Sequence, residues 1–77
     1  MFFSDKDLYE NIGKNIKKYR VDKNLTQLQL CERVGISLSY LSKLESSCCN
    51  KSISISCLNS IATVLNVEIE NFFKECE

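Results

Sequence analysis

The stretch LTQLQLCERVGISLSYLSKLE, residues 25–45, decides the fold that the sequence predicts. Thr26 is a favourable cap for a helix, and Gln29 three positions later completes a capping box, in which each side chain bonds the other residue's backbone N–H. Gly35 ends that helix because glycine adopts the required positive φ without strain. Ser37 then caps a second short helix. Two short helices joined at a glycine predict a helix-turn-helix.

The second of these helices has two distinct faces. Tyr40, Leu41 and Leu44 form an apolar stripe that is expected to point inward. The other face carries Leu38, Ser39, Ser42, Lys43 and Ser46. A helix with this division can pack on a core and still present polar side chains to a partner.

At this point the residues resemble the Xre/Cro-type, phage-repressor-like DNA-binding family. The hallmark of that family is T-Q-x-x-L-[small]-x-x-[V/L]-G-[I/V]-S-x-S-Y-[L/I]-S-x-[L/I]-E, and it is met by Thr26, Gln27, Leu30, Cys31, Val34, Gly35, Ile36, Ser37, Ser39, Tyr40, Leu41, Ser42, Leu44 and Glu45. The similarity extends to IGKNIKKYR before the motif and LNSIATVLNVEIENFF after it, about residues 10–74. The resemblance implies one domain over residues 1–77, an all-α, five-helix repressor-like fold with its motif at about 26–46.

The flanking patterns agree with a small helical bundle. Leu8, Ile12, Ile16 and Tyr19 form one helical stripe within a helix expected from about Asp7 to Asp22. Beyond the motif, Ser54 is expected to cap a helix over about 55–65, and Asn66 to end that helix in a left-handed turn. Glu68 is then expected to cap a fifth helix, whose apolar side carries Ile69, Phe72 and Phe73. The chain has no proline and no convincing strand pattern.

Charge is unevenly distributed along the chain. The net charge is zero over 77 residues, yet residues 14–51 hold eight basic side chains against three acidic ones. The two ends are correspondingly acidic. A charge run is usually a solvated face, but this one surrounds the motif that would meet DNA phosphates.

Composition argues against several classes of protein. No apolar run approaches the length of a membrane span and no signal peptide is visible, so a cytoplasmic protein is expected. The chain has five cysteines, no histidine and no C-x-x-C, which leaves a common zinc site without support and predicts free thiols in a reducing cytosol. No nucleophile–base pair or glycine-rich phosphate loop is present, so we expect no enzyme and no cofactor. Because a second domain is not expected in 77 residues, no small-molecule effector is expected either.

The resemblance also implies roles for individual residues. Base contacts are expected from Leu38, Ser39, Ser42 and Lys43, and DNA-backbone contacts from Gln27, Ser37, Tyr40, Asn50, Lys51 and Lys17. A partly buried ion pair is implied between Arg20 and Glu45. The expected partner is a near-palindromic operator in double-stranded DNA, bound by a homodimer whose interface contains Ile69, Phe72 and Phe73.

Several alternatives stay open at this stage. The regulator would be a phage-type repressor, a restriction–modification controller or a regulator of host genes. Two other classes are an antitoxin-like protein-interaction module and a thiol sensor using Cys48 and Cys49, with Cys57 as another possible partner. The lysines of the first helix could form only a solvated face, and Phe72 and Phe73 could simply complete the core of the monomer.

Overall fold

The computed structural model describes residues 4–46 and 53–75. Within those ranges the elements are α1 (Asp5–Asp22), α2 (Gln27–Val34), α3 (Leu38–Glu45), α4 (Ile55–Leu65) and the 3-10 helix η1 (Ile69–Phe73). No strand occurs in these two segments, and the all-α fold class is confirmed.

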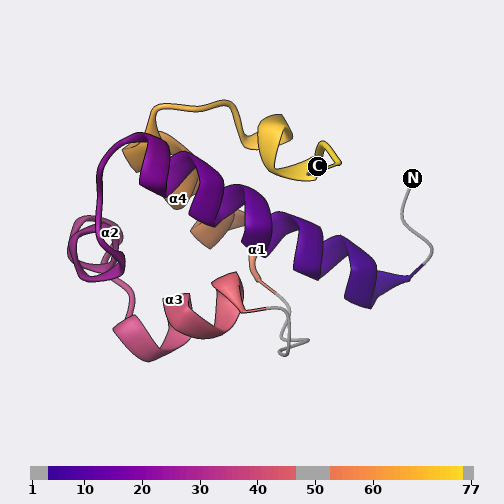
Figure 1. Ribbon diagram of the computed structural model, residues 1–77, viewed down its shortest axis with the longest axis horizontal. Coiled ribbons are helices and arrows are strands. Elements are labelled where there is room, and N and C mark those ends of the chain that lie inside the picture. The colour runs from indigo at the N-terminus through magenta and orange to yellow at the C-terminus, as the bar shows by residue number, and fades with distance from the viewer. Residues whose placement is uncertain (1–3, 47–52, 76–77) are drawn as a thin grey trace.

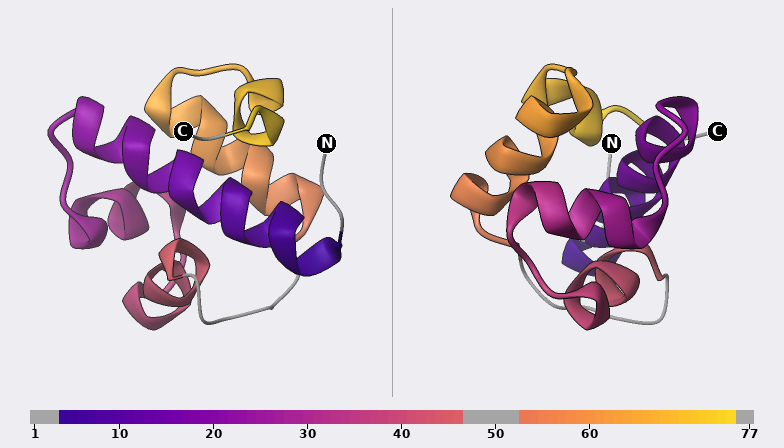
Figure 2. Two further views of the ribbon diagram at one scale, coloured as in Figure 1. Left: turned by 45° about the vertical axis from the view of Figure 1, so that its right-hand side comes forward. Right: turned by 90° about the vertical axis from the view of Figure 1, so that its left-hand side faces the viewer.

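Helix α1 is the central element of the bundle. It packs against α3 on one side and against η1 on another, while α2 and α4 contact each other (Figure 1). The further views show that the helix-turn-helix and the C-terminal elements lie to different sides of α1 (Figure 2). Helix α1 therefore contacts both halves of the molecule, and α2 and α4 join the two halves directly.

The caps of α2, α3 and α4 form as the sequence predicts, whereas the expected cap by Glu68 was wrong, because its side chain makes no capping bond at the start of η1. Thr26 and Gln29 exchange both bonds of the capping box, at 3.1 and 2.9 Å. Gly35 has a φ of 86°, and Asn66 closes α4 at a φ of 57° in the left-handed region. Ser4 accepts a bond from the Asp7 N–H, so α1 begins two residues earlier than expected.

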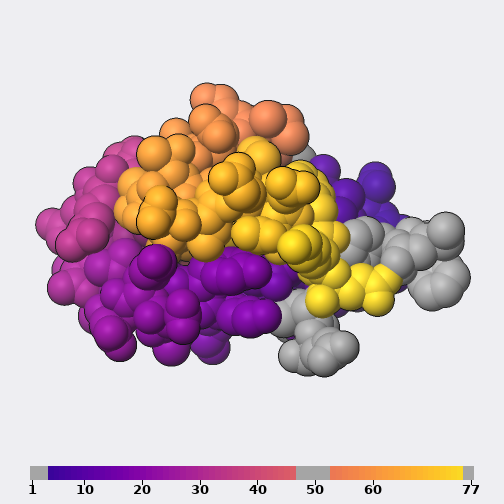
Figure 3. Space-filling model, turned by 90° about the horizontal axis from the view of Figure 1, so that it is seen from above, coloured from indigo at the N-terminus to yellow at the C-terminus, as the bar shows by residue number. Residues whose placement is uncertain are grey.

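The core is formed by one apolar cluster to which all the elements contribute. Ile12 and Ile16 come from α1, and the remaining buried members are Leu30, Cys31, Leu41, Leu58, Ile61, Ala62, Leu65 and Phe72. Tyr19 meets Phe72 edge to face, with ring centroids 6.0 Å apart. The space-filling view shows η1 seated against both α4 and α1 (Figure 3).

The expectation of a fifth α-helix was wrong, because Ile69–Phe73 is a single 3-10 helix. Two buried asparagines of α1 account for where it stops. Nδ2 of Asn15 donates to the carbonyls of Phe72 at 3.0 Å and Lys74 at 2.7 Å, and Nδ2 of Asn11 donates to the same two carbonyls at 3.4 and 2.7 Å. Side chains therefore take the carbonyls that a longer helix would have used for its own bonds.

Phe72 and Phe73 have different surroundings, and the expectation that both belong to a dimer interface needs correction. Phe72 is fully buried in the core of the monomer, whereas Phe73 is 38% exposed. A side chain with no exposed surface has none to offer a second copy. Phe72 therefore completes the core of the chain itself.

Gly13 allows α1 and α3 to approach closely. A Cβ at this position would lie 2.0 Å from the carbonyl oxygen of Leu44. The two backbones can pack this tightly only because glycine has no side chain.

None of the helices in the described ranges is both long enough and apolar enough to cross a membrane.

Candidate nucleic-acid interface

The ion pair between Arg20 and Glu45 lies at the junction of α1 and α3. Nε of Arg20 lies 2.8 Å from Oε2 of Glu45, and a second guanidinium nitrogen donates to Oε1 at 2.9 Å. The third nitrogen donates to the Leu25 carbonyl at 2.7 Å. Only 10% of the arginine side chain and 3% of the glutamate side chain are exposed. The pair implied by the sequence is thus present, and it also holds the turn before α2.

Gln27, the first residue of α2, extends this network. Its Nε2 donates to Oε1 of Glu45 at 3.1 Å, and its Oε1 accepts a bond from the Ser42 hydroxyl at 3.1 Å. A continuous network of hydrogen-bonded side chains therefore runs from α1 through Glu45 and Gln27 to the middle of α3. It orients the start of α2 relative to α3.

The four residues expected to read bases differ in accessibility. Leu38 is 45% exposed, and Ser39 and Lys43 are also exposed. Ser42 is half-buried, and its hydroxyl donates to Gln27. The outward face of α3 therefore presents an apolar side chain, a hydroxyl and a cation.

Ser37 and Tyr40 have internal contacts at the start of α3. The Ser37 hydroxyl accepts the Tyr40 N–H at 3.0 Å and thereby caps the helix. Tyr40 is half-buried, and burial together with the neighbouring Cys57 raises the pKa of its hydroxyl. The pKa of the Cys57 thiol is raised by burial as well. The half-buried tyrosine thus contacts Cys57 of α4 as well.

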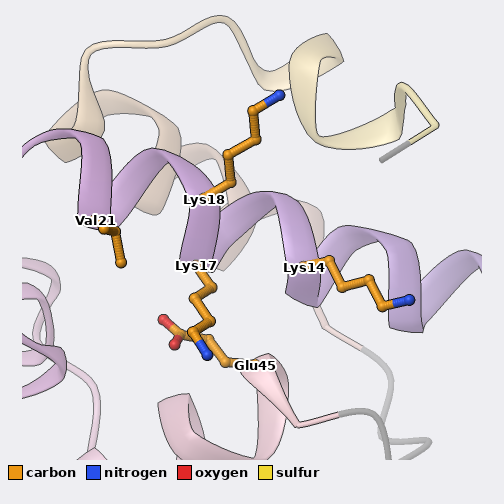
Figure 4. Close-up of a pocket in the computed structure, with 5 residues that line it drawn as sticks. All are labelled: Lys14, Lys17, Lys18, Val21 and Glu45. Atoms are coloured by element: carbon orange, nitrogen blue, oxygen red, sulfur yellow. The ribbon is translucent and has the colours of Figure 1, made fainter. Parts of the chain in front are cut away.

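A basic groove follows the outer side of α1 beside the ion pair. It is lined by Lys14, Lys17, Lys18, Val21 and Glu45. Figure 4 shows Lys17 extending from α1 toward Glu45, while Lys18 leaves the helix on the other side. All three lysines are exposed, and Lys18 also lies over the Tyr19 ring at 5.5 Å.

Part of the expected site lies outside the described residues, namely Asn50, Lys51 and the cysteines Cys48 and Cys49. Among the residues that are described, no three histidine, cysteine or acidic side chains are grouped so that they could hold a metal ion.

Comparison with known proteins agrees with this geometry. A family described as helix-turn-helix (HTH_3) matches residues 16–72. The chain belongs to this Xre/Cro-like family. It is 34% identical over 64 residues to the transcriptional regulator SinR of Bacillus licheniformis, covering 83% of this chain and 57% of SinR. It is 36% identical over 58 residues to the immunity repressor of Bacillus phage phi105, covering 75% and 39%. The chain thus spans just over half of the length of SinR and less than half of the length of the immunity repressor.

Two solved structures have the same architecture. The restriction–modification controller protein C.AhdI of Aeromonas hydrophila superposes with a TM-score of 0.77 at 25% identity, covering 84% of this chain and 96% of that one. The biofilm regulator SinR in complex with DNA gives 0.76 at 33% identity, covering 82% and 98%. Transcription regulators of this family therefore share both the fold and the helix-turn-helix of this chain.

The sequence analysis did not predict three features of the structure. It assigned Ser42 to the bases and did not foresee its bond to Gln27. It did not single out Gly13, or the asparagines Asn11 and Asn15 that hold the C-terminal segment. A glycine and two asparagines inside a predicted helix, where both residue types are unfavourable, are the signal that could have drawn attention to them.

Proposed function

We propose that this chain is a sequence-specific, double-stranded-DNA-binding transcription regulator and not an enzyme. The observation that carries the proposal is the α2–α3 unit, in which the exposed residues of α3 lie beside a polar chain that fixes the start of α2. The DNA complex of the similar regulator SinR supports the same reading.

In this proposal α3 enters the major groove with its N-terminal part leading. Lys43 would donate to O6 or N7 of a guanine, and the Leu38 side chain would contact a thymine methyl. Ser39 can either donate or accept and is less selective. We expect about 1–3 kcal/mol of base discrimination from the lysine contact.

The DNA backbone would be held from α1 and α2. Gln27 can donate to a phosphate from its amide and from its backbone N–H, because the first N–H groups of a helix have no partner within it. Ser37 and Tyr40, together with Asn50 and Lys51 further along the sequence, would contact the backbone beside it. Lys17 and the other lysines of the basic groove would add attraction that weakens with salt.

A dimer on a near-palindromic operator is the assembly that we propose. Two copies would place their α3 helices on half-sites about one helical turn apart. Phe73, 38% exposed, and the half-buried Ile69 are the apolar side chains that the C-terminal segment offers to a second copy. Fully buried Phe72 contributes only by supporting them.

The experiment that tests the function is selection of duplexes from a random-sequence library at about 150 mM salt, where phosphate attraction alone is weak. We expect an enriched inverted repeat from the wild type. Lys43→Ala should relax the preference at one base pair of each half-site, whereas the control Lys6→Ala, at the exposed start of α1, should leave it unchanged. No enrichment by folded wild-type protein would contradict the proposal and favour a protein-interaction module.

A further inference from the structure

The hydrogen bonds of the Gln27 amide have only one consistent arrangement. A carboxylate paired with arginine can only accept, so Nε2 of Gln27 must face Glu45, at 3.1 Å. The amide oxygen then faces Ser42, also at 3.1 Å. Because that oxygen can only accept, the Ser42 hydroxyl must donate. The chemistry of the partners thus fixes both the orientation of the amide and the direction of the serine bond.

This arrangement limits what Ser42 can do at a base edge. A serine hydroxyl has a single hydrogen, and that hydrogen is directed to Gln27 inside the protein. Ser42 is also half-buried, in contrast to the exposed Ser39 and Lys43 on the same helix. Ser42 is therefore poorly placed to distinguish bases.

We propose that Ser42 is a positioning residue for the phosphate anchor and not a base reader. Together with Glu45 it holds the Gln27 amide in one orientation, in which the second hydrogen of Nε2 is left for a DNA phosphate. The chain Arg20–Glu45–Gln27–Ser42 then sets the anchor on α2 relative to the reading helix α3. This inference rests on the proposed DNA-binding function.

The first test compares Ser42→Ala with Ser39→Ala, a matched serine on the same helix. Each variant is titrated against the selected duplex and against all of its single-base-pair variants. Loss of one hydrogen bond should make Ser42→Ala bind every duplex about 3–10-fold more weakly, with the base preferences unchanged. Ser39→Ala should instead change the preference at one base pair. Ser42→Thr, which keeps the hydroxyl, should restore the affinity.

A double variant examines whether Ser42 acts through Gln27. In a Gln27→Ala background the further change Ser42→Ala should have no additional effect on affinity, because the amide that it positions is gone. An equal loss in both backgrounds, or a changed preference at a single base pair, would overturn the positioning role.

The second test needs no DNA. In the free protein, the side-chain amide resonances of Gln27 in a ¹H–¹⁵N spectrum should move in Ser42→Ala and stay in place in Ser39→Ala. An unmoved amide would overturn the positioning role even if the protein binds DNA. Wild-type protein that binds no duplex would overturn the DNA-binding function instead, so the two failures can be told apart.

Discussion

The two halves of this molecule are attached to α1 by different physical means. The helix-turn-helix side is held by the nearly buried Arg20–Glu45 ion pair and by the hydrogen bonds that extend from it through Gln27. The close approach of the α1 and α3 backbones at Gly13 adds to these contacts. The C-terminal side is held by apolar burial around Phe72 and by two asparagines that bond backbone carbonyls. Apolar packing stabilises without strict direction, whereas ion pairs and hydrogen bonds fix orientation. Both halves thus share the apolar core and are oriented by hydrogen bonds to α1, and the half that would read DNA is oriented by an ion pair as well.

The largest effect is expected from breaking the ion pair on the motif side. Arg20→Met leaves the Glu45 carboxylate buried without its cation and should lower the free energy of unfolding by about 3–5 kcal/mol. The measurement is urea unfolding followed by circular dichroism.

Two controls accompany the Arg20 variant. Lys17→Met, on an exposed position of the same helix, should change stability by less than about 0.5 kcal/mol. The double variant Arg20→Met/Glu45→Leu should recover most of the loss, because no uncompensated charge remains. A loss in Arg20→Met no greater than that in Lys17→Met would show that the pair does not hold the helix-turn-helix to α1.

A somewhat smaller effect is expected at the crossing of α1 and α3. Alanine normally stabilises a helix relative to glycine by about 1 kcal/mol. Gly13→Ala should do the opposite and cost about 2–3 kcal/mol, since its Cβ would meet the Leu44 carbonyl and force the helices apart. Gly35→Ala is the comparison, because nothing lies within 4 Å there and only the positive φ opposes it, at about 1–2 kcal/mol. Equal stability of Gly13→Ala and wild type in urea would show that α3 can shift without cost.

On the C-terminal side the expected effect is smaller again. Asn15→Ala removes two bonds from the end of η1 and should cost about 1–2 kcal/mol, because Asn11 still serves both carbonyls. Asn59→Ala, at an exposed position in α4, is the matched control. Once corrected for the folded fraction, the affinity of Asn15→Ala for DNA should equal that of wild type. A change in base preference would show that the two halves are coupled more strongly than their contacts suggest.

The same contrast explains how far the sequence could predict the structure. The helix boundaries and caps of the motif depend on residues three or four positions apart, such as Thr26 with Gln29. Local spacing was therefore enough to predict them. The Arg20–Glu45 pair joins residues 25 positions apart, and only the family resemblance implied it.

What the sequence did not predict depends on distant segments meeting. Asn15 bonds a carbonyl 57 residues away, and nothing near it in the chain indicates that partner. The apolar positions Ile69, Phe72 and Phe73 fit an α-helix as well as a 3-10 helix, so their spacing alone could not predict the helix type. Ser42 was predicted to contact DNA bases because it lies on the same helix face as Ser39 and Lys43. In the fold, however, Gln27 lies close enough to accept a hydrogen bond from the Ser42 hydroxyl.

The smallest predicted effect is the pH response of Cys31 on the motif side. Burial first, and then the nearby Glu45 carboxylate, raise the pKa of this thiol above its ordinary value of 9.0. The folded protein therefore keeps a proton that the unfolded chain loses, so this contribution to stability is complete below about pH 8 and falls as pH rises past 9. The free energy of unfolding, measured in urea at pH 7 and at about pH 9.5, should decrease less in Cys31→Ala than in wild type. The two proteins share all their other titrating groups, so the difference reports on the Cys31 thiol. Equal decreases in the two proteins would mean that the thiol ionises as readily in the folded protein as in the unfolded chain.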